Sequence, residues 1–346
     1  MTEPVLVPAV GRELFATRPE PGVDPVGYHV RPERLVRRAL RHAGWLSPDQ
    51  SLRARLEIED DGPRASAAIA LWLAPGPYLP PAQLRSLLDR LPRLRWVYSQ
   101  ITGVEHLDLA EFQRRGILVS NNGTLSSRRV AEMALACILA HAKRLPRHFD
   151  MQRARRWRSL GSQDLNRQTV GIVGTGAIGT ELASMCRALG MHVIGASRQP
   201  DRFGSDPSPF HRVLDLRGEL KTLLGESDHV VLALPLNDAT RGAIDAAALA
   251  QMRPSAALIN VSRGPLVDED ALCDALARGS VAAAYIDRPS TLPPPRWSRL
   301  YRTPNLVLTH YSAAASPHAT AEAFGQFVAG LRTLLTTGVP ADLVTH

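Results

Sequence analysis

The stretch that decides the fold is Thr-Val-Gly-Ile-Val-Gly-Thr-Gly-Ala-Ile-Gly, which runs from Thr169 to Gly179. Its apolar beginning predicts a short buried strand. Gly174, Gly176 and Gly179 then form a G-x-G-x-x-G pattern, and the apolar residues that follow recur near helical spacing until Gly190, which suits the left-handed end of a helix. A strand, a glycine-rich turn and a helix in this order predict the start of a βαβ unit.

Each glycine of this pattern has a physical reason in a dinucleotide-binding turn. Gly174 allows the tight turn, Gly176 lets the backbone approach a pyrophosphate, and Gly179 lets the helix pack closely on the strand. The helix that begins at Ala177 and Ile178 presents free N–H groups and the positive end of its dipole to the phosphates. A glycine-rich turn that binds nothing is the alternative, but the complete order of elements favours a dinucleotide cofactor.

The residues after the next predicted strand, Met191 to Ala196, indicate which cofactor is bound. An acidic side chain at this place would hydrogen-bond the adenosine ribose of NAD. The sequence has Ser197 and Arg198 instead, with Arg202 nearby, and a hydroxyl and a guanidinium suit a 2′-phosphate. We therefore expect NADP(H) to be preferred over NAD(H); the alternative is that Arg198 is a solvated surface arginine.

Length and composition limit the class of protein. A chain of 346 residues, of which 45% are hydrophobic, suggests two globular domains. No apolar run is long enough to cross a membrane, and the first residues lack the features of a secretory signal, so we expect a cytoplasmic protein. Cys137, Cys186 and Cys273 are odd in number and far apart, which fits neither a metal site nor a disulfide framework.

The net charge of +8 requires that nucleic-acid binding be considered. The arginines are spread along the chain, with local clusters at 31–41 and 153–158, and neither zinc-finger spacing nor an RNA-binding aromatic signature accompanies them. An anionic substrate and an anionic cofactor would also favour a positive cleft. We expect small-molecule ligands and no nucleic acid.

Short apolar runs alternate with helical patterns along the rest of the chain. Strands are predicted at 5–10, 65–73, 94–99, 117–120, 229–234, 256–261, 281–286 and 306–309. Helices are predicted at 31–42, 81–91, 126–144 and 319–336, and the basic stretch from 145 to 166 is predicted to be irregular. This alternation predicts an α/β fold with doubly wound parallel sheets. Ligands of such sheets bind beyond the carboxyl ends of the strands, where Pro235, Arg263 and His310 fall.

Several further motifs resemble those of one enzyme family. They are Gly-Val-Glu-His-Leu-Asp at 103–108, Val-Ala-Glu at 130–132, Leu-Pro-Leu at 234–236 with Thr240, Asn-Val-Ser-Arg-Gly-Pro-Leu-Val-Asp at 260–268, Pro-Asn at 304–305 and Gly-Val-Pro at 338–340. From Trp96 to its C-terminus, the chain is similar to the D-isomer-specific 2-hydroxyacid dehydrogenases. Several motifs in the right order are far more specific than the glycine pattern alone.

The resemblance implies two Rossmann-like domains with a cleft between them. It implies a flavodoxin-like substrate domain from residues 1–121 and 313–346, a dinucleotide-binding domain from residues 122–312, and a homodimer. It also implies that the chain binds a small carboxylate substrate. Hydride transfer would reduce a 2-keto acid or a related carbonyl compound to its 2-hydroxy product.

The resemblance also assigns roles to individual residues. Arg263 would hold the substrate carboxylate and carbonyl through its forked guanidinium, although an arginine here could also merely cap a strand end. Backbone N–H groups near Thr102 and Gly103 would bind the substrate carboxylate. The remaining residues assigned to the cofactor site are Leu234, Pro235, Thr240, Val261, Ser262 and Asp287.

Two catalytic positions depart from the family pattern. The family's glutamate lies in an Asp-Val-Phe-x-x-Glu-Pro segment, and the corresponding region here reads Tyr-Ile-Asp-Arg-Pro-Ser-Thr-Leu-Pro at 285–293. Matching the Leu-Pro end of this region places Ser290 at the glutamate, and Asp287 is a weaker substitute that would need a shifted strand end. The family's Thr-Pro-His corresponds to Thr-His-Tyr-Ser at 309–312, so that an alignment without a gap selects Tyr311 and one with a missing residue selects His310. Reduction of a keto acid leaves an alkoxide that needs a proton, and an imidazole donor would favour His310. A packing role for either residue is the alternative.

The departures leave three functions open. The first is an NADPH-dependent reductase of a 2-keto acid or related carbonyl compound. The second is a non-catalytic NADP(H)-binding regulator or scaffold, as the C-terminal binding protein co-repressors show for proteins resembling this family. The third is a reductase of an unusual substrate in specialised metabolism, which would share Arg263 and the Ser197–Arg198 pair with the first.

Overall fold

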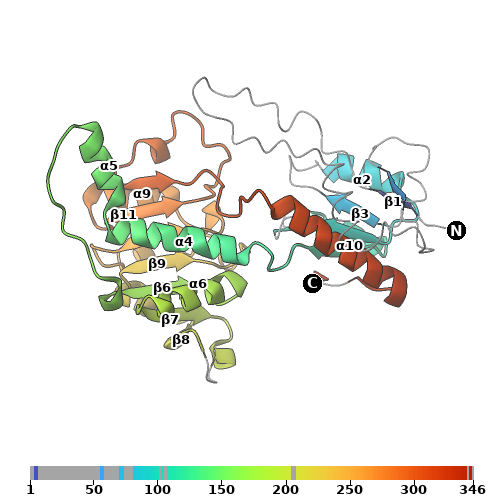
Figure 1. The fold of residues 1–346 in the computed structure, drawn as a ribbon, viewed down its shortest axis with the longest axis horizontal. Helices are drawn as coiled ribbons and strands as arrows, with labels where there is room; N and C mark the ends of the chain where they lie inside the picture. Colours follow the sequence, from blue (N-terminus) through green and yellow to red (C-terminus); the bar gives the residue numbers. More distant parts are fainter. Residues whose placement is uncertain are drawn as a thin grey trace. The chain divides into compact units, whose positions relative to one another are not determined.

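The computed structural model describes residues 4–6, 55–57, 70–73, 81–100, 103–104, 107–203, 208–340 and 343–344. The chain divides into two compact units (Figure 1): unit 1 comprises Met1–Ser126 and Ser316–His346, and unit 2 comprises Ser127–Ala315. Thr102, the helix predicted at 31–42 and parts of the strands predicted at 5–10 and 65–73 lie outside the described residues. Each unit is built around one parallel sheet.

Unit 1 contains a five-stranded parallel sheet with the order β2-β1-β3-β4-β5. Its strands are β1 (Pro4–Leu6), β2 (Arg55–Glu57), β3 (Ala70–Leu73), β4 (Trp96–Ser99) and β5 (Leu118–Asn121). This is the strand order of flavodoxin-like sheets. The short strand β2 was not predicted from the sequence.

Helices cover both faces of the sheet in unit 1. The helix α10 (Ala319–Thr337) packs against Trp96 on one face. On the other face, α2 (Pro81–Asp89) and α3 (Leu109–Arg114) pack against Val97. Successive residues of a strand point to opposite faces, so that adjacent residues of β4 enter two separate cores.

Unit 2 contains a seven-stranded parallel sheet with the order β12-β11-β10-β9-β6-β7-β8. Its strands are β6 (Thr169–Val173), β7 (His192–Ser197), β8 (Arg212–Asp215), β9 (His229–Leu232), β10 (Ala257–Asn260), β11 (Ala283–Ile286) and β12 (Leu306–Leu308). The strand order reverses between β6 and β9, and ligands of open α/β sheets bind at such a switch point. The edge strand β8 was not predicted, because only Leu214 of its residues is buried and the apolar pattern is weak.

The helices of unit 2 also lie in two layers. One layer is formed by α4 (Ser127–Ala142) and α6 (Ala177–Ala188), and the other by α7 (Leu220–Glu226), α8 (Ala246–Leu249) and α9 (Glu269–Arg278). On β6, Ile172 packs with the first layer and Val173 with the second. Short 3-10 turns occur at Leu165–Arg167, Pro200–Phe203, Gly264–Leu266 and Arg299–Tyr301. Together the two units confirm the predicted α/β fold with two doubly wound, Rossmann-like domains.

One predicted irregular stretch is wrong in part. Residues Leu145–Arg153 form the helix α5, with Pro146 near its start, which lies at the margin of unit 2 in Figure 1. None of its residues is buried, and Leu145 and Phe149 are exposed. A helix that buries no face has no reason to repeat apolar residues at helical spacing, so the usual sequence signal is missing.

In the ranges that the structure describes, no helix combines the length and the apolar character needed to cross a membrane. Cys137, Cys186 and Cys273 are buried free thiols. Burial raises the pKa of the Cys137 and Cys186 thiols to about 12, which leaves these two thiols protonated and unreactive at neutral pH.

Candidate active site

The glycine-rich turn after β6 fits closely against the neighbouring strand end. Gly174 has a backbone φ of +106°, a conformation that residues with a Cβ rarely adopt. A Cβ on Gly174 would overlap the carbonyl group of Ala233, which follows β9. A Cβ on Gly179 would overlap the carbonyl oxygen of Gly174. These two glycines are therefore required by the packing of unit 2 itself.

Gly176 differs because the space beside it is open. It is the N-cap residue of α6, it is exposed, and a Cβ built on it would meet no heavy atom within 4 Å. A glycine has no side chain with which to cap the helix, and the first N–H groups of a helix have no intrahelical partner. Ala177 and Ile178 begin the helix at this point. The turn thus fits a dinucleotide pyrophosphate, which such a helix start attracts.

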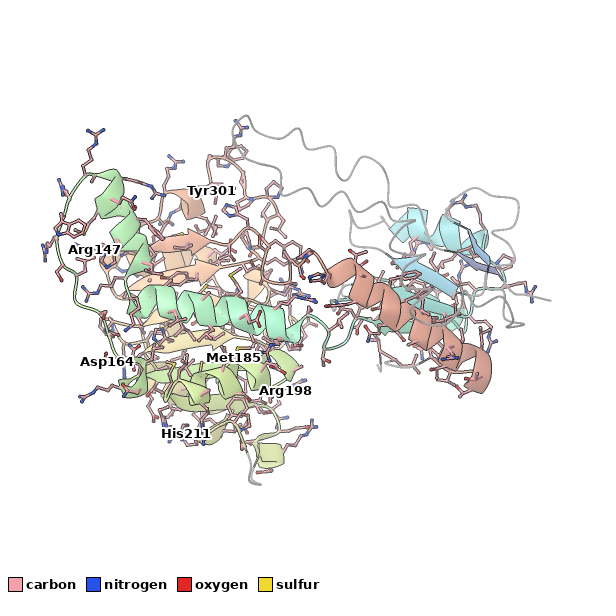
Figure 2. The ribbon with its side chains drawn as sticks, viewed as in Figure 1. Arg147, Asp164, Met185, Arg198, His211 and Tyr301 are labelled. Carbon is pink, nitrogen blue, oxygen red and sulfur yellow. The ribbon has the colours of Figure 1, made fainter. Side chains whose placement is uncertain are left out.

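The end of β7 lies at the same edge of the sheet as the glycine-rich turn. Its last residue, Ser197, accepts a hydrogen bond on Oγ from the backbone N–H of Gln199 at 3.1 Å. Arg198 (Figure 2) is exposed and makes no hydrogen bond or ion pair with another described residue. Arg202 donates to the side-chain oxygen of Gln199 at 3.4 Å. Asp215 lies beside Ser197 in the sheet register, and Asp201 lies between Arg198 and Arg202 in the chain, so carboxylates as well as cations occur here.

The loop after β9 is closed by a buried threonine. The hydroxyl of Thr240 donates to the carbonyl oxygen of Pro235 at 2.8 Å and accepts from the N–H of Asn237 at 2.9 Å. Leu234 is buried in the core of unit 2, whereas Pro235 is exposed. Of the residues assigned to the cofactor here, Thr240 and Leu234 therefore shape the loop, and Pro235 forms its surface.

Arg263 is held by the end of β10. The side chain of Asn260 accepts a hydrogen bond from the N–H of Ser262 at 3.0 Å and donates one to the carbonyl oxygen of Arg263 at 2.8 Å. The Ser262 hydroxyl donates to the carbonyl oxygen of Leu232 on β9 at 3.1 Å. Val261 and Ser262 are buried, whereas the side chain of Arg263 is partly exposed. The backbone around the arginine is therefore fixed while its side chain can meet a ligand.

Asp287, at the end of β11, organises the loop after β12. Its Oδ1 atom accepts hydrogen bonds from the Thr309 hydroxyl at 2.5 Å and from the N–H groups of Ser312 at 2.9 Å and Ala313 at 3.1 Å. Its own N–H donates to the carbonyl oxygen of Asn260 at 3.0 Å. This buried carboxylate is thus committed to the fold. The strand β11 ends at Ile286, as predicted, and the role of Asp287 as a substitute for the family's glutamate stays a prediction.

The loop that Asp287 holds contains His310 and Tyr311. Both are exposed, and their φ angles are +54° and +58°. Left-handed backbone costs roughly 1–2 kcal/mol per residue for L-amino acids. The hydrogen bonds to Asp287, which include one from the Tyr311 N–H to the Asp287 carbonyl oxygen at 2.7 Å, offset this cost. The guanidinium of Arg288 lies 5.0 Å from the centre of the Tyr311 ring.

A further carboxylate reaches the loop after β11 from α9, the helix that precedes this strand. Glu269, the first residue of α9, accepts hydrogen bonds on Oε1 from the N–H of Ser290 at 2.7 Å and from its hydroxyl at 3.0 Å. Gly264 packs against the same segment, because a Cβ built on it would overlap the backbone of Pro289 and Ser290. Ser290, which stands at the glutamate position by resemblance, is therefore joined to an acidic residue elsewhere in the sequence.

Three predicted site residues, Arg263, His310 and Tyr311, thus follow strands β10 and β12 at one edge of the sheet, with Asp287 between them. Asn260 and Thr309, which complete this network, were not singled out from the sequence, although each is a polar residue at the end of an apolar strand. Gly103 lies in unit 1 and is partly buried. Within the described ranges, no three His, Cys, Asp or Glu side chains form a group that could hold a metal ion.

The comparison with known protein families agrees with this geometry. Residues 135–313 match the NAD binding domain of the D-isomer specific 2-hydroxyacid dehydrogenases. The chain belongs to this family. The match contains the glycine-rich turn, Arg263, Asp287 and the loop with His310 and Tyr311. The chain is therefore a 2-hydroxyacid dehydrogenase family enzyme with an NAD(P)-binding domain, as its motifs predicted.

Individual members of the 2-hydroxyacid dehydrogenase family are similar over most of the chain. The glyoxylate/hydroxypyruvate reductase B of Yersinia enterocolitica is 33% identical over 67% of this chain and 72% of its own length. The glyoxylate reductase of Thermococcus kodakarensis is 32% identical over 75% of this chain and 78% of its own length. The crystal structure of a family member from Xanthobacter autotrophicus Py2 in complex with NADPH and MES is 26% identical, covers 99% of this chain and 98% of its own, and has a TM-score of 0.75.

Proposed function

We propose that the chain is an NADPH-dependent reductase that converts a small 2-keto acid to its 2-hydroxy product. One observation carries the proposal: a continuous set of hydrogen bonds through Asn260 and Asp287 links the Arg263 loop to the loop of His310 and Tyr311. A cation that can hold a carboxylate and a group that can supply a proton are thus fixed together. They lie at the edge of a sheet whose glycine-rich turn fits a dinucleotide.

NADPH, rather than NADH, is supported by the end of β7. The nicotinamide supplies the hydride in either cofactor, so the choice depends on the adenosine end. Arg198 is exposed and unengaged among the described residues, and its guanidinium can pair with a 2′-phosphate. The carboxylate of Asp215, which accepts a hydrogen bond from the N–H of Arg217 at 3.0 Å, weighs against this choice.

The substrate is proposed to be a compound of the glyoxylate and hydroxypyruvate class, which the names of the relatives from Yersinia and Thermococcus support. The forked guanidinium of Arg263 would hold the carboxylate and the carbonyl of such a compound through two hydrogen bonds. The backbone N–H groups of Thr102 and Gly103 are proposed as further contacts of the carboxylate. A positively charged site would also attract the anionic substrate.

The alkoxide formed by reduction is proposed to take its proton from His310. An imidazole is well suited to give a proton near neutral pH. Tyr311 is the second candidate, and its ring is occupied on one face by Arg288. With Ser290 at the glutamate position, this site would work without the family's usual glutamate–histidine pairing.

A second copy of the chain is proposed as the partner. Leu145 and Phe149 of α5 are exposed, and Trp157 beyond it is fully exposed. Tryptophan and phenylalanine are enriched at protein–protein interfaces relative to the rest of the surface. A homodimer that covers this segment would remove these apolar surfaces from water.

The experiment follows the oxidation of NADPH and NADH with glyoxylate, hydroxypyruvate, pyruvate and bulkier keto acids. We expect NADPH-selective turnover that falls at least about 100-fold in Arg263→Ala, since removal of one charge-stabilising donor costs this much in other enzymes. Arg278→Ala, at the exposed end of α9, is the matched control and should retain wild-type turnover. Tight NADPH binding without turnover on the whole panel would contradict the proposed substrate class.

A further inference from the structure

We propose that Glu269 is a positioning residue for Arg263, acting through Ser290 and Gly264. The inference rests on the proposed function, because it makes substrate binding by Arg263 depend on Glu269, which lies outside the predicted site. Glu269 does not need to touch the substrate in this role. It would hold the loop against which the arginine's own loop packs.

The contact between Glu269 and Ser290 joins two separate loops. Both hydrogen bonds reach a single carboxylate oxygen, at 2.7 Å from the backbone N–H and 3.0 Å from the hydroxyl. The two residues are 21 positions apart, and Glu269 makes no ion pair with any residue that the structure describes. The carboxylate of Glu269 is therefore used to bind Ser290 and not to neutralise a neighbouring cation.

The packing of Gly264 against Ser290 closes a circuit of contacts that begins and ends next to Arg263. Gly264 follows Arg263 directly, and the 3-10 turn Gly264–Leu266 leads to the start of α9 and Glu269. From Glu269 the hydrogen bonds cross to Ser290, whose backbone packs back on Gly264 so closely that no Cβ fits between them. Movement of Ser290 would therefore change the support of the backbone next to Arg263.

The residue type at position 290 agrees with this arrangement. An acidic side chain there would face the carboxylate of Glu269, and two adjacent carboxylates repel each other. A serine instead donates a hydroxyl hydrogen bond in addition to its backbone N–H. Ser290 and Glu269 thus form one matched pair, in which the acceptor comes from α9 and the donors come from the loop after β11.

Asp270 provides a matched control for the position of Glu269 in the helix. Both acidic residues lie in the first turn of α9, where each is favourable to the helix dipole. Asp270 instead pairs with Arg299 at 3.4 Å, away from Ser290. Replacement of either residue removes a negative charge from the same turn, but only replacement of Glu269 removes the contact with Ser290.

The test compares Glu269→Ala, Glu269→Gln and Asp270→Ala by steady-state kinetics with NADPH and glyoxylate. We expect Glu269→Ala to raise the KM for glyoxylate about tenfold, the loss of about 1.4 kcal/mol of binding, while the KM for NADPH changes less than about twofold. Glutamine can accept both hydrogen bonds from Ser290, so Glu269→Gln should restore the KM. Asp270→Ala should resemble the wild type. Equal KM values in Glu269→Ala and Asp270→Ala would overturn the proposal, as would a failure of glutamine to restore the KM.

Amide hydrogen exchange on the ligand-free chain decides the inference independently of the substrate. Loss of the contact in Glu269→Ala should speed exchange in segments 287–292 and 261–267, whereas Asp270→Ala should change neither. Unchanged exchange at 261–267 in Glu269→Ala would overturn the coupling to the arginine. If the wild type reduces no keto acid, the proposed function fails, and the exchange result still shows whether Glu269 supports the Arg263 loop.

Discussion

Two groups of loops lie at the carboxyl edge of the seven-stranded sheet in unit 2, and they are held in place differently. The β6–β7 side consists of the glycine-rich turn and Ser197–Arg198, whose motif residues are close together in the sequence, although Gly174 also packs against Ala233 after β9. The β10–β12 side consists of the loops with Arg263, Asp287 and His310, which are joined by hydrogen bonds between separate strands. The first is a local motif and the second is a tertiary network.

The comparison shows where a sequence motif alone is sufficient to predict the geometry of a loop. A Cβ on Gly179 is excluded by Gly174, five positions earlier in the same turn. Asp287, in contrast, binds residues that follow a different strand. A family member can therefore change residues on the β10–β12 side without losing its dinucleotide-binding motif. The departures at Ser290, His310 and Tyr311 all fall on that side.

The largest effect is expected on kcat, from replacement of the proposed proton donor His310 on the β10–β12 side. If His310 supplies the proton, His310→Asn should lower kcat about 1,000-fold, since general acid catalysis typically contributes 100- to 10,000-fold. Asparagine tolerates the left-handed backbone, so the loop should keep its shape. Tyr311→Phe is the control and should retain kcat within a few-fold, with NADPH affinity unchanged in both variants. If Tyr311→Phe abolished turnover and His310→Asn remained active, the proton donor would be the phenol of Tyr311 and not His310.

The next effect concerns the stability of the network itself. Asp287→Ala removes the acceptor of three hydrogen bonds and should lower the free energy of unfolding by about 2–4 kcal/mol. Thr309→Val removes one of these donors and should cost about 1 kcal/mol. Equilibrium unfolding in urea measures both. Equal losses in the two variants would show that the bonds to the backbone N–H groups contribute little.

The glycine-rich turn offers a smaller, paired test of the local motif. Gly179→Ala should lower the melting temperature, because its Cβ overlaps the Gly174 carbonyl oxygen. Gly176→Ala should leave the melting temperature nearly unchanged but weaken NADPH binding about 30-fold, or about 2 kcal/mol, because its methyl group enters the space proposed for the pyrophosphate. Thermal melts and fluorescence titration separate the two effects. Unchanged NADPH affinity in Gly176→Ala would place the pyrophosphate elsewhere.

The smallest expected effect is at the end of β7. Arg198→Ala should weaken NADPH binding about fivefold, near 1 kcal/mol, because an exposed ion pair is screened by solvent. NADH affinity should stay the same, since NADH lacks the 2′-phosphate. The ratio of the two dissociation constants is the measurement, with Arg202→Ala as a second variant expected to change it less. Equal weakening of both cofactors would contradict a phosphate-binding role for Arg198.

Much of the fold was predictable because buried parallel strands leave clear apolar runs. The strands β9, β10 and β11 were predicted within two residues of their ends, and α4 and α10 within two residues as well. Two of the failures, α5 and β8, share a cause. The helix α5 buries no residue, and β8 buries only Leu214 on the edge of its sheet, so neither needs the apolar repetition on which prediction relies.

By itself, the sequence determined the family, the α/β class and the residues that follow each central strand, because these depend on local turns and on the periodicity of burial. Only the tertiary structure decided what those residues contact. Nothing near Asp287 in the sequence indicates that it would bind the turn at Ser312, and nothing near Ser290 indicates a bond to Glu269. Such contacts arise because parallel strands bring their carboxyl ends to one edge, where side chains far apart in sequence become neighbours.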